Sequence, residues 1–211
     1  MKSEKYIKVL NNTELGKGTT HEYYVLVTGS YNVDDIFDSF TNDTTYFIDK
    51  IDNSIIENIR IQKSRETRIV GLGPYYRKYD LNAGDVLIFE RLENNNGSIS
   101  FYLNNIKKNN NLVLQKVGSK GYEILTQNLH LTFPLVIDSC LLNGESIQLN
   151  ISFKQSVKKR ADSPSTTDFY DILVDGNHYN FGGNELIEII IEEDLKILKK
   201  LNPWNKYCVQ W

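Results

Sequence analysis

Apolar residues are arranged along this chain in short runs rich in β-branched and aromatic side chains, and polar stretches containing Gly, Asn or Pro separate these runs. Runs of this length and composition are typical of β-strands. They predict strands over residues 6–10, 23–27, 46–48, 55–61, 67–72, 86–89, 99–103, 112–117, 122–125, 129–137, 147–153, 168–174 and 177–181. We therefore expect a mainly β protein, α+β by count.

Helical spacing of apolar residues is found in only a few segments. It predicts one short helix over residues 33–40 and a second over residues 75–81, where Gly73 and Pro74 end the preceding strand. The apolar segment 185–191 precedes a predicted closing helix that ends at about residue 201. Consecutive strands with two small helices favour an open pseudobarrel of about seven strands over a parallel α/β sheet.

The polar stretch over residues 104–111 divides the 211 residues into two predicted units. We expect the pseudobarrel over residues 1–106 and a second β-rich unit, an accessory or connector that ends in the closing helix, over residues 107–211. Residues 154–167 are charged and then rich in Ser and Pro, which predicts a mobile loop. The last residues form an incomplete apolar segment, so we expect the chain to continue into a longer parent protein.

The overall charge excludes nucleic-acid binding through net charge alone, because 24 Lys and Arg face 27 Asp and Glu, for a net charge of -3. A local basic face is still compatible with this balance. Cys140 and Cys208 are too few for a disulfide framework or a thiolate zinc site, and the N-terminus lacks a signal-peptide pattern. No apolar run approaches the roughly 20 residues of a membrane span. We expect a reduced, soluble, cytoplasmic protein without a membrane partner.

Two polar loops stand out because each is held between predicted strands. The first covers residues 13–21 and contains Gly16 and Gly18, which let the backbone approach a partner closely. The second covers residues 62–68 and is charged. Two such loops on a β scaffold are suited to gripping a polyanion.

The first loop, with the strand after it, resembles the N-terminal arm of the prokaryotic B3-like DNA-binding domains, the specificity modules of restriction endonucleases of the EcoRII, BfiI, NgoAVII and LlaJI type. Glu14, Gly16, His21 and Glu22 stand at the acidic, Gly, His and Gln positions of that arm. The sequence departs from the pattern at Glu22, where the family has Gln, and at Tyr24, where it has Gly.

Two further segments add to the resemblance, which covers about half of the chain. Residues 75–89 are similar to the L-x-x-G-D-x-x-x-F element of plant B3 domains, carried here by Leu81, Gly84, Asp85 and Phe89. The charged loop stands between these segments, where the family's C-terminal arm carries its DNA-contacting charges. The second unit resembles no family that we can name.

The resemblance implies a sequence-specific reader of double-stranded DNA whose two loops enter the major groove, with no cofactor and no metal. It implies further domains or subunits of a restriction complex as partners, and catalysis outside this chain. Arginine would make a bidentate contact to guanine, and glutamate would accept a hydrogen bond from the cytosine amino group. Lys and Thr would contact phosphate. The predicted DNA-binding residues are Lys17, Thr19, Thr20, His21, Glu22, Gln62, Lys63, Ser64, Arg65, Glu66 and Arg68.

Other interpretations of the same residues stay open. Each loop also fits an ordinary solvated surface loop. Asp175 with Asp194 and Lys196 has the spacing of a Mg²⁺-dependent restriction nuclease, in which carboxylates bind the metal and lysine orients water. A predicted helix over residues 192–200 explains the latter two equally well through the helix dipole. A third hypothesis makes residues 112–211 a protein-interaction module.

Overall fold

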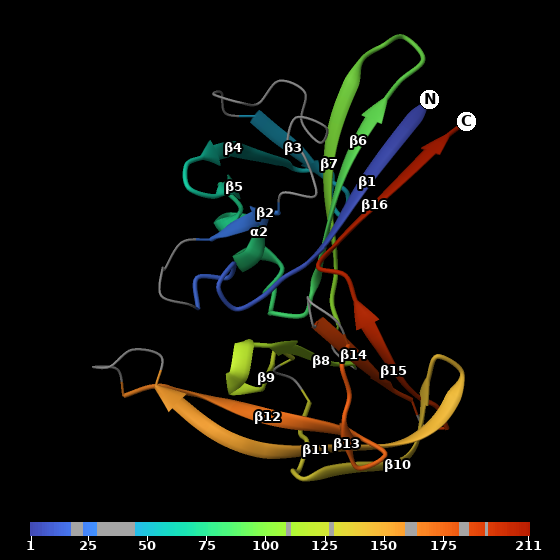
Figure 1. Cartoon of the computed structure of the whole chain (residues 1–211). Coiled ribbons are helices and arrows are strands. Elements are labelled where there is room, and N and C mark those ends of the chain that lie inside the picture. Colours follow the sequence, from blue (N-terminus) through green and yellow to red (C-terminus); the bar gives the residue numbers. More distant parts are fainter. Residues whose placement is uncertain are drawn as a thin grey trace. The chain divides into compact units, whose positions relative to one another are not determined.

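The computed structural model describes residues 1–17, 23–28, 45–108, 111–126, 129–158, 164–181, 186–192 and 194–211. The chain forms two compact units (Figure 1). The first comprises Met1–Lys107 together with Trp204–Trp211, and the second comprises Lys108–Pro203. The division thus falls near the polar stretch in the middle of the sequence, but the last residues return to the first unit.

The first unit is a curled, open sheet with the strand order β16-β1-β6-β7-β3-β4-β5-β2. All strand pairs are antiparallel except β3 with β7. The elements are β1 (Lys2–Val9), β2 (Tyr24–Val27), β3 (Thr45–Asp49), β4 (Ile55–Lys63), β5 (Thr67–Val70), α2 (Gly73–Lys78), β6 (Val86–Glu93), β7 (Ile99–Ile106) and β16 (Trp204–Gln210).

The core of the first unit follows from the two-residue period of its strands. Val25, Ile69 and Ile61 lie opposite one another across β2, β5 and β4, and all three are buried. Aromatic rings extend this core: Phe89 stacks on Trp204 with ring centroids 6.2 Å apart. The indole N–H of Trp204 donates to the Leu26 carbonyl at 3.0 Å, which fixes β16 in the first unit.

The second unit is a closed barrel of seven strands. Its sheet has the order β11-β10-β15-β14-β8-β9-β12-β13. β12 also pairs with β11, which closes a ring of the first seven strands in this order, and β13 pairs with β12 outside the ring. The elements are β8 (Asn111–Lys116), the 3-10 helix η1 (Gly118–Lys120), β9 (Tyr122–Ile124), β10 (Leu135–Leu142), β11 (Glu145–Lys158), β12 (Thr166–Val174), β13 (Asn177–His178), β14 (Leu186–Ile191) and β15 (Lys196–Leu201).

The prediction of a mainly β protein is confirmed, and so is the second short helix, which forms as α2 with Pro74 in its first turn. The predicted helix over residues 33–40 lies outside the described residues. Each predicted strand of the first half has a counterpart among β1 to β7, in the predicted order. The sequence pattern therefore located these strands correctly, although it did not indicate how the sheet is completed by β16.

The prediction of a closing helix is wrong, because residues 196–201 form β15. Ile197, Leu198 and Leu201 do fall at helical spacing. However, β15 is paired with β14 on one side and with β10 on the other, and this double pairing overrides the local pattern.

Three boundaries in the second half also differ from the prediction. The strand predicted over residues 129–137 begins only at Leu135, after Pro134, which has no N–H for a ladder hydrogen bond. The strand predicted over residues 177–181 is the two-residue β13. Much of the predicted mobile loop over residues 154–167 instead belongs to β11 and β12, which pair as far as Lys158 opposite Thr166.

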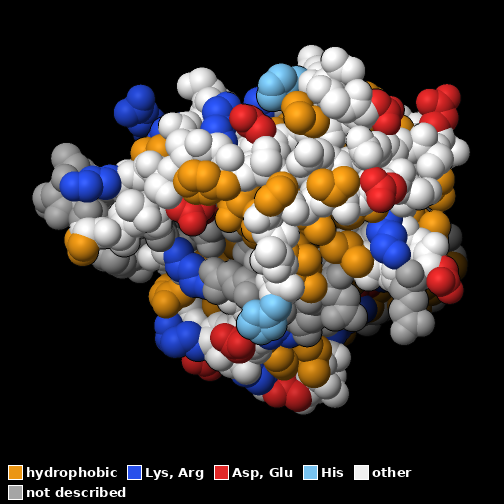
Figure 2. All heavy atoms as spheres, turned by 90° about the horizontal axis from the view of Figure 1, so that it is seen from below, with side chains coloured by type: hydrophobic (Ala, Val, Ile, Leu, Met, Phe, Trp, Pro, Cys, Tyr) orange, Lys and Arg blue, Asp and Glu red, His pale blue; other side chains and the backbone are white. Residues whose placement is uncertain are grey.

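In the part of the chain that the structure describes, no helix combines the length and the apolar character that crossing a membrane requires. Basic and acidic side chains of the described residues are interspersed on the face drawn in Figure 2, with hydrophobic side chains between them. Charge on this face is therefore mixed rather than of one sign.

Candidate nucleic-acid interface

The charged loop over residues 62–68, which we call the second arm, lies in the hairpin of β4 and β5. The polar loop before β2 is the first arm. The two strands pair up to Lys63 and Thr67, and residues 64–66 form the turn. The Ser64 N–H donates to the Glu66 carbonyl at 3.1 Å and so closes this turn. All five residues from 62 to 66 are exposed. The arm is therefore a solvent-facing loop on a strand pair whose inner side is buried.

Arg68 is held in place on the outer side of this hairpin. Its Nη2 and Nε atoms donate to Glu66 Oε2 at 2.8 and 3.2 Å. Its guanidinium also lies over the Tyr24 ring of the neighbouring strand, 4.3 Å from the ring centroid. A planar guanidinium that is stacked and hydrogen-bonded at the same time has lost much of its rotational freedom before any ligand arrives.

The remaining cations of the hairpin are presented to solvent. Arg65 is exposed at the turn, and no hydrogen bond or ion pair of its side chain is found within the described ranges. Lys63 is exposed at the end of β4. The sixteen residues from Ile55 to Val70 carry four basic and two acidic side chains, although the whole chain has a net charge of -3. The hairpin is thus locally basic.

Arg60 is a candidate that the motif comparison missed. It lies two residues before Gln62 on β4, is exposed, and alternates with the buried Ile59 and Ile61. Because side chains alternate across a strand, Arg60 lies on the same outer face as Gln62 and Arg68. The two-residue period of this segment was the signal that could have identified it.

The base of the first arm is anchored by the buried carboxylate of Glu14, whose residue is 1% exposed. Glu14 Oε1 accepts from the Leu26 N–H at 2.9 Å, and Oε2 accepts from the Asn11 N–H at 3.1 Å. Lys8 Nζ lies 3.1 Å from Oε2. Burial raises the pKa of Glu14 above its ordinary value, and the charge of Lys8 together with these N–H groups opposes this effect. Glu14 is therefore a structural anchor rather than a DNA contact.

The far end of the first arm rests on α2. The Tyr23 ring meets the Tyr76 ring edge-on, with centroids 6.0 Å apart, and the Arg77 guanidinium lies 5.6 Å from the Tyr23 centroid. Any side chain at Gly73 would approach Tyr23 Cδ2 to 3.1 Å, so glycine permits this close packing. Arg77 is exposed and adds a cation near the arm.

Only one of the proposed DNA contacts in the first arm can be placed. Lys17 Nζ donates to Asn82 Oδ1 at 3.4 Å. The other predicted contacts of this arm, Thr19, Thr20, His21 and Glu22, lie outside the described residues.

The two arms flank the β2–β5 strand pair. Tyr24 lies opposite Val70 and Val27 lies opposite Thr67, so the first arm enters at one end of the pair and the hairpin turn adjoins the other. The two ends of the pair are three residue steps apart, which corresponds to roughly 10 Å along a strand. This length is similar to the width of the B-DNA major groove, which is about 12 Å.

Residues 81–89, which carry the similarity to the plant B3 element, have a structural role. Asp85 Oδ2 accepts from the Asn82 N–H at 2.8 Å, and the Gly84 N–H donates to the Leu10 carbonyl at 2.8 Å. Phe89 is fully buried. Asp85 therefore fixes the turn that precedes β6.

The residues of the nuclease hypothesis are not brought together. Asp175 lies in the turn after β12, where its Oδ1 accepts from the Gln148 N–H at 2.7 Å. Lys196 begins β15 and Asp194 lies two residues before it, and β11 and β10 separate β12 from β15 around the barrel. Within the described residues, no three His, Cys, Asp or Glu side chains are grouped so that they could hold a metal ion.

Comparison of the chain with models of known protein families, and with curated proteins, gave no match.

Proposed function

We propose that this chain is a sequence-specific double-stranded DNA-binding module that reads its site in the major groove through two arms. It would serve as the target-recognition part of a restriction endonuclease or of its motor subunit, with catalysis outside the chain. The observation that carries the proposal is the outer face of the β4–β5 hairpin. There, Arg68 is held by Glu66 and Tyr24 beside the exposed Arg65.

The local order of elements supports the B3-like part of the proposal. Strands β1 to β7 and helix α2 follow one another as expected for such a domain, and the β4–β5 hairpin coincides with the charged segment. The roughly 10 Å between the two arms along the β2–β5 pair is compatible with a groove about 12 Å wide.

The proposal assigns different tasks to the cations. Arg65 is free to make a bidentate contact to guanine, and Arg68 would do so by exchanging one of its bonds to Glu66 for a base. Lys63, Lys17 and Arg60 would contact phosphates, which sets the position of the duplex without reading its sequence. Affinity would thus come from local charge, in agreement with the acidic balance of the whole chain.

The test begins with a selection of bound duplexes from a random pool, using the full chain. We expect one enriched site and a steep loss of affinity with salt, because phosphate neutralisation releases counterions. Arg65→Ala should cost about 1 to 3 kcal/mol at one base pair, whereas Lys63→Ala should weaken all duplexes equally and lower the salt slope by about 1.

Lys200→Ala is the matched control, because Lys200 is an exposed lysine of the second unit and should leave binding unchanged. A pool without an enriched site, or specificity that survives both Arg65→Ala and Arg68→Ala, contradicts the proposal. Cleavage of the selected duplex with Mg²⁺, lost in Asp194→Ala, would place catalysis within the chain.

A further inference from the structure

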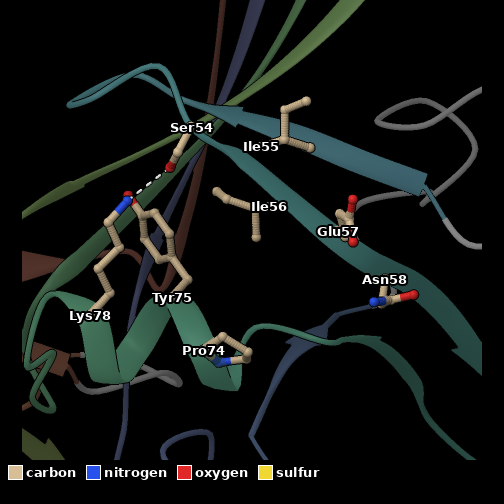
Figure 3. A pocket seen from close by; sticks show the side chains of 8 residues that line it. All are labelled: Ser54, Ile55, Ile56, Glu57, Asn58, Pro74, Tyr75 and Lys78. Atoms are coloured by element: carbon tan, nitrogen blue, oxygen red, sulfur yellow. Dashed lines mark hydrogen bonds between the residues drawn. The ribbon is translucent and has the colours of Figure 1, made fainter.

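A slot of about 300 Å³ opens in the first unit between the first half of β4 and helix α2. Figure 3 shows Tyr75 and Lys78 rising from α2, Pro74 at the start of the same helix, and Ile56 pointing from β4 toward the helix. The slot is lined by Ser54, Ile55, Ile56, Glu57, Asn58, Pro74, Tyr75 and Lys78. Its walls are thus largely apolar, and its polar groups lie at its two ends.

At the cationic end of the slot, every N–H donor of the Lys78 ammonium already has an acceptor. Lys78 Nζ lies 2.8 Å from Asp49 Oδ2, 2.6 Å from Asp52 Oδ2 and 2.9 Å from Ser54 Oγ. A lysine ammonium has three N–H donors, so all of them are used. The carboxylates raise the pKa of Lys78, which keeps it charged and bound. It has no donor left for an anionic ligand.

The opposite end of the slot offers acceptors. Glu57 and Asn58 are exposed, and neither side chain makes a hydrogen bond or an ion pair with another described residue. Two carboxylates, Asp49 and Asp52, already outnumber the single positive charge of Lys78, and the Glu57 carboxylate adds to this excess of negative charge. A ligand with a positively charged donor would satisfy it, whereas a phosphate would be repelled.

The apolar surface extends beyond the slot. Ile55 is 63% exposed at its rim, and Ile51 and Tyr46, on the same β3–β4 hairpin, are 51% and 57% exposed. Three large apolar side chains at this level of exposure on one hairpin form more apolar surface than a single small amine can cover. A longer, partly apolar partner fits this surface better.

The slot is also separated from the DNA-reading arm along β4. Glu57 and Ser64 are seven residue steps apart, which corresponds to roughly 20 Å in a strand. A partner in the slot therefore lies well away from a duplex on the β4–β5 hairpin, although helix α2, which lines the slot, also contacts Tyr23 at the end of the first arm.

We propose that this slot docks a segment of a partner protein in which an apolar side chain is flanked by arginine or lysine. The apolar side chain enters between Ile56, Pro74 and Tyr75, and the basic group pairs with Glu57. The slot would thereby connect the first unit to another protein, at a distance from the turn of the β4–β5 hairpin.

The test follows amide resonances of the ¹⁵N-labelled full chain by NMR while a blocked peptide, Gly-Ser-Arg-Leu-Arg-Ser-Gly, is added up to millimolar concentration. We expect saturable shifts at residues 54–58 and 74–78. Two matched peptides, one with serine for the leucine and one with glutamate for both arginines, should give at least tenfold weaker binding. Spermidine, which supplies amines without an apolar group, should also bind at least tenfold more weakly.

Two variants test the assigned residues, and both alter exposed side chains. Glu57→Lys should weaken binding of the basic peptide at least tenfold, and Ile55→Thr should weaken it measurably. Glu192→Lys, at an exposed acidic residue of the second unit, should not change it. Absence of saturable shifts, equal binding of the acidic peptide or of spermidine, or unchanged affinity in Glu57→Lys would overturn the proposal.

Discussion

Replacing Glu14 by alanine is expected to lower the free energy of unfolding of the first unit by about 3 to 5 kcal/mol, as for other broken buried ion pairs. The substitution leaves the ammonium of Lys8 buried without its carboxylate, since the side chain of Lys8 is only 5% exposed. It also removes the acceptors of two backbone N–H groups, those of Leu26 and Asn11. A buried donor that loses its partner costs about 1 to 3 kcal/mol by itself.

Tryptophan fluorescence during denaturation with urea measures this loss selectively. Both tryptophans of the chain, Trp204 and Trp211, lie in the first unit, and Trp204 is buried. Glu14→Gln keeps an oxygen acceptor for Leu26 and should be less destabilising than Glu14→Ala. Glu66→Gln is the control, because it breaks an ion pair whose carboxylate side chain is 48% exposed to solvent, and it should cost at most about 1 kcal/mol.

This prediction also bears on function, because Glu14 anchors the first arm against β2. If that arm takes part in DNA binding, Glu14→Gln should weaken binding of the selected duplex under conditions in which the first unit remains folded. A Glu14→Ala variant with the stability of the wild type would show that the carboxylate does not hold the arm in place.

Replacing Gly71 by alanine is expected to destabilise the first unit by about 2 to 5 kcal/mol, which combines backbone strain with overpacking. Gly71 has a φ of +93°, in the left-handed region that side chains disfavour. A Cβ at this position would lie 2.2 Å from the Asn58 carbonyl oxygen, a backbone atom of β4 that cannot move aside alone. Asn58 itself has a φ of 61°, at the irregular point in the β3–β4 register.

Gly97→Ala separates the cost of backbone strain from the cost of overpacking. Gly97 also has a positive φ, of +79°, but a Cβ there would meet no atom within 4 Å. We expect a cost of about 1 to 2 kcal/mol, from backbone strain alone. Urea denaturation followed by tryptophan fluorescence again reports the first unit. Equal effects of the two substitutions would show that the close approach of Gly71 to Asn58 does not stabilise the fold.

The two ends of β4 differ in surface chemistry. The β4–β5 hairpin has exposed cations beside an ordered arginine, whereas the other end of β4 has exposed apolar side chains and a carboxylate, Glu57, that pairs with no other described residue. These surfaces favour ligands of opposite charge. If both proposals hold, one strand connects a DNA-reading face to a protein-docking face.

Part of the candidate interface was predictable from the sequence because its signals are local. The run Gln62 to Arg68 is polar between two apolar strands, and such a segment must lie at the surface. The alternation of apolar Ile59 and Ile61 with Arg60 likewise predicts that Arg60 lies on the outer face of its strand. In contrast, the burial of Glu14 beside Lys8 could not be predicted, because the partners come from β1 and β2 and meet only after the sheet forms.

By itself, the sequence determined that this protein is mainly β, where most strands of the first unit lie, and which hairpin is charged. These properties depend on the composition and the period of short segments. The tertiary structure decided that residues 196–201 form a strand, that β12 closes a barrel by pairing with both β9 and β11, and that β16 returns to the first sheet. It also decided that Lys78 uses all its donors on Asp49, Asp52 and Ser54, while Glu57 pairs with no other described residue. Strand pairing and the partners of a charged group are set by residues far apart in the chain, so local patterns do not encode them.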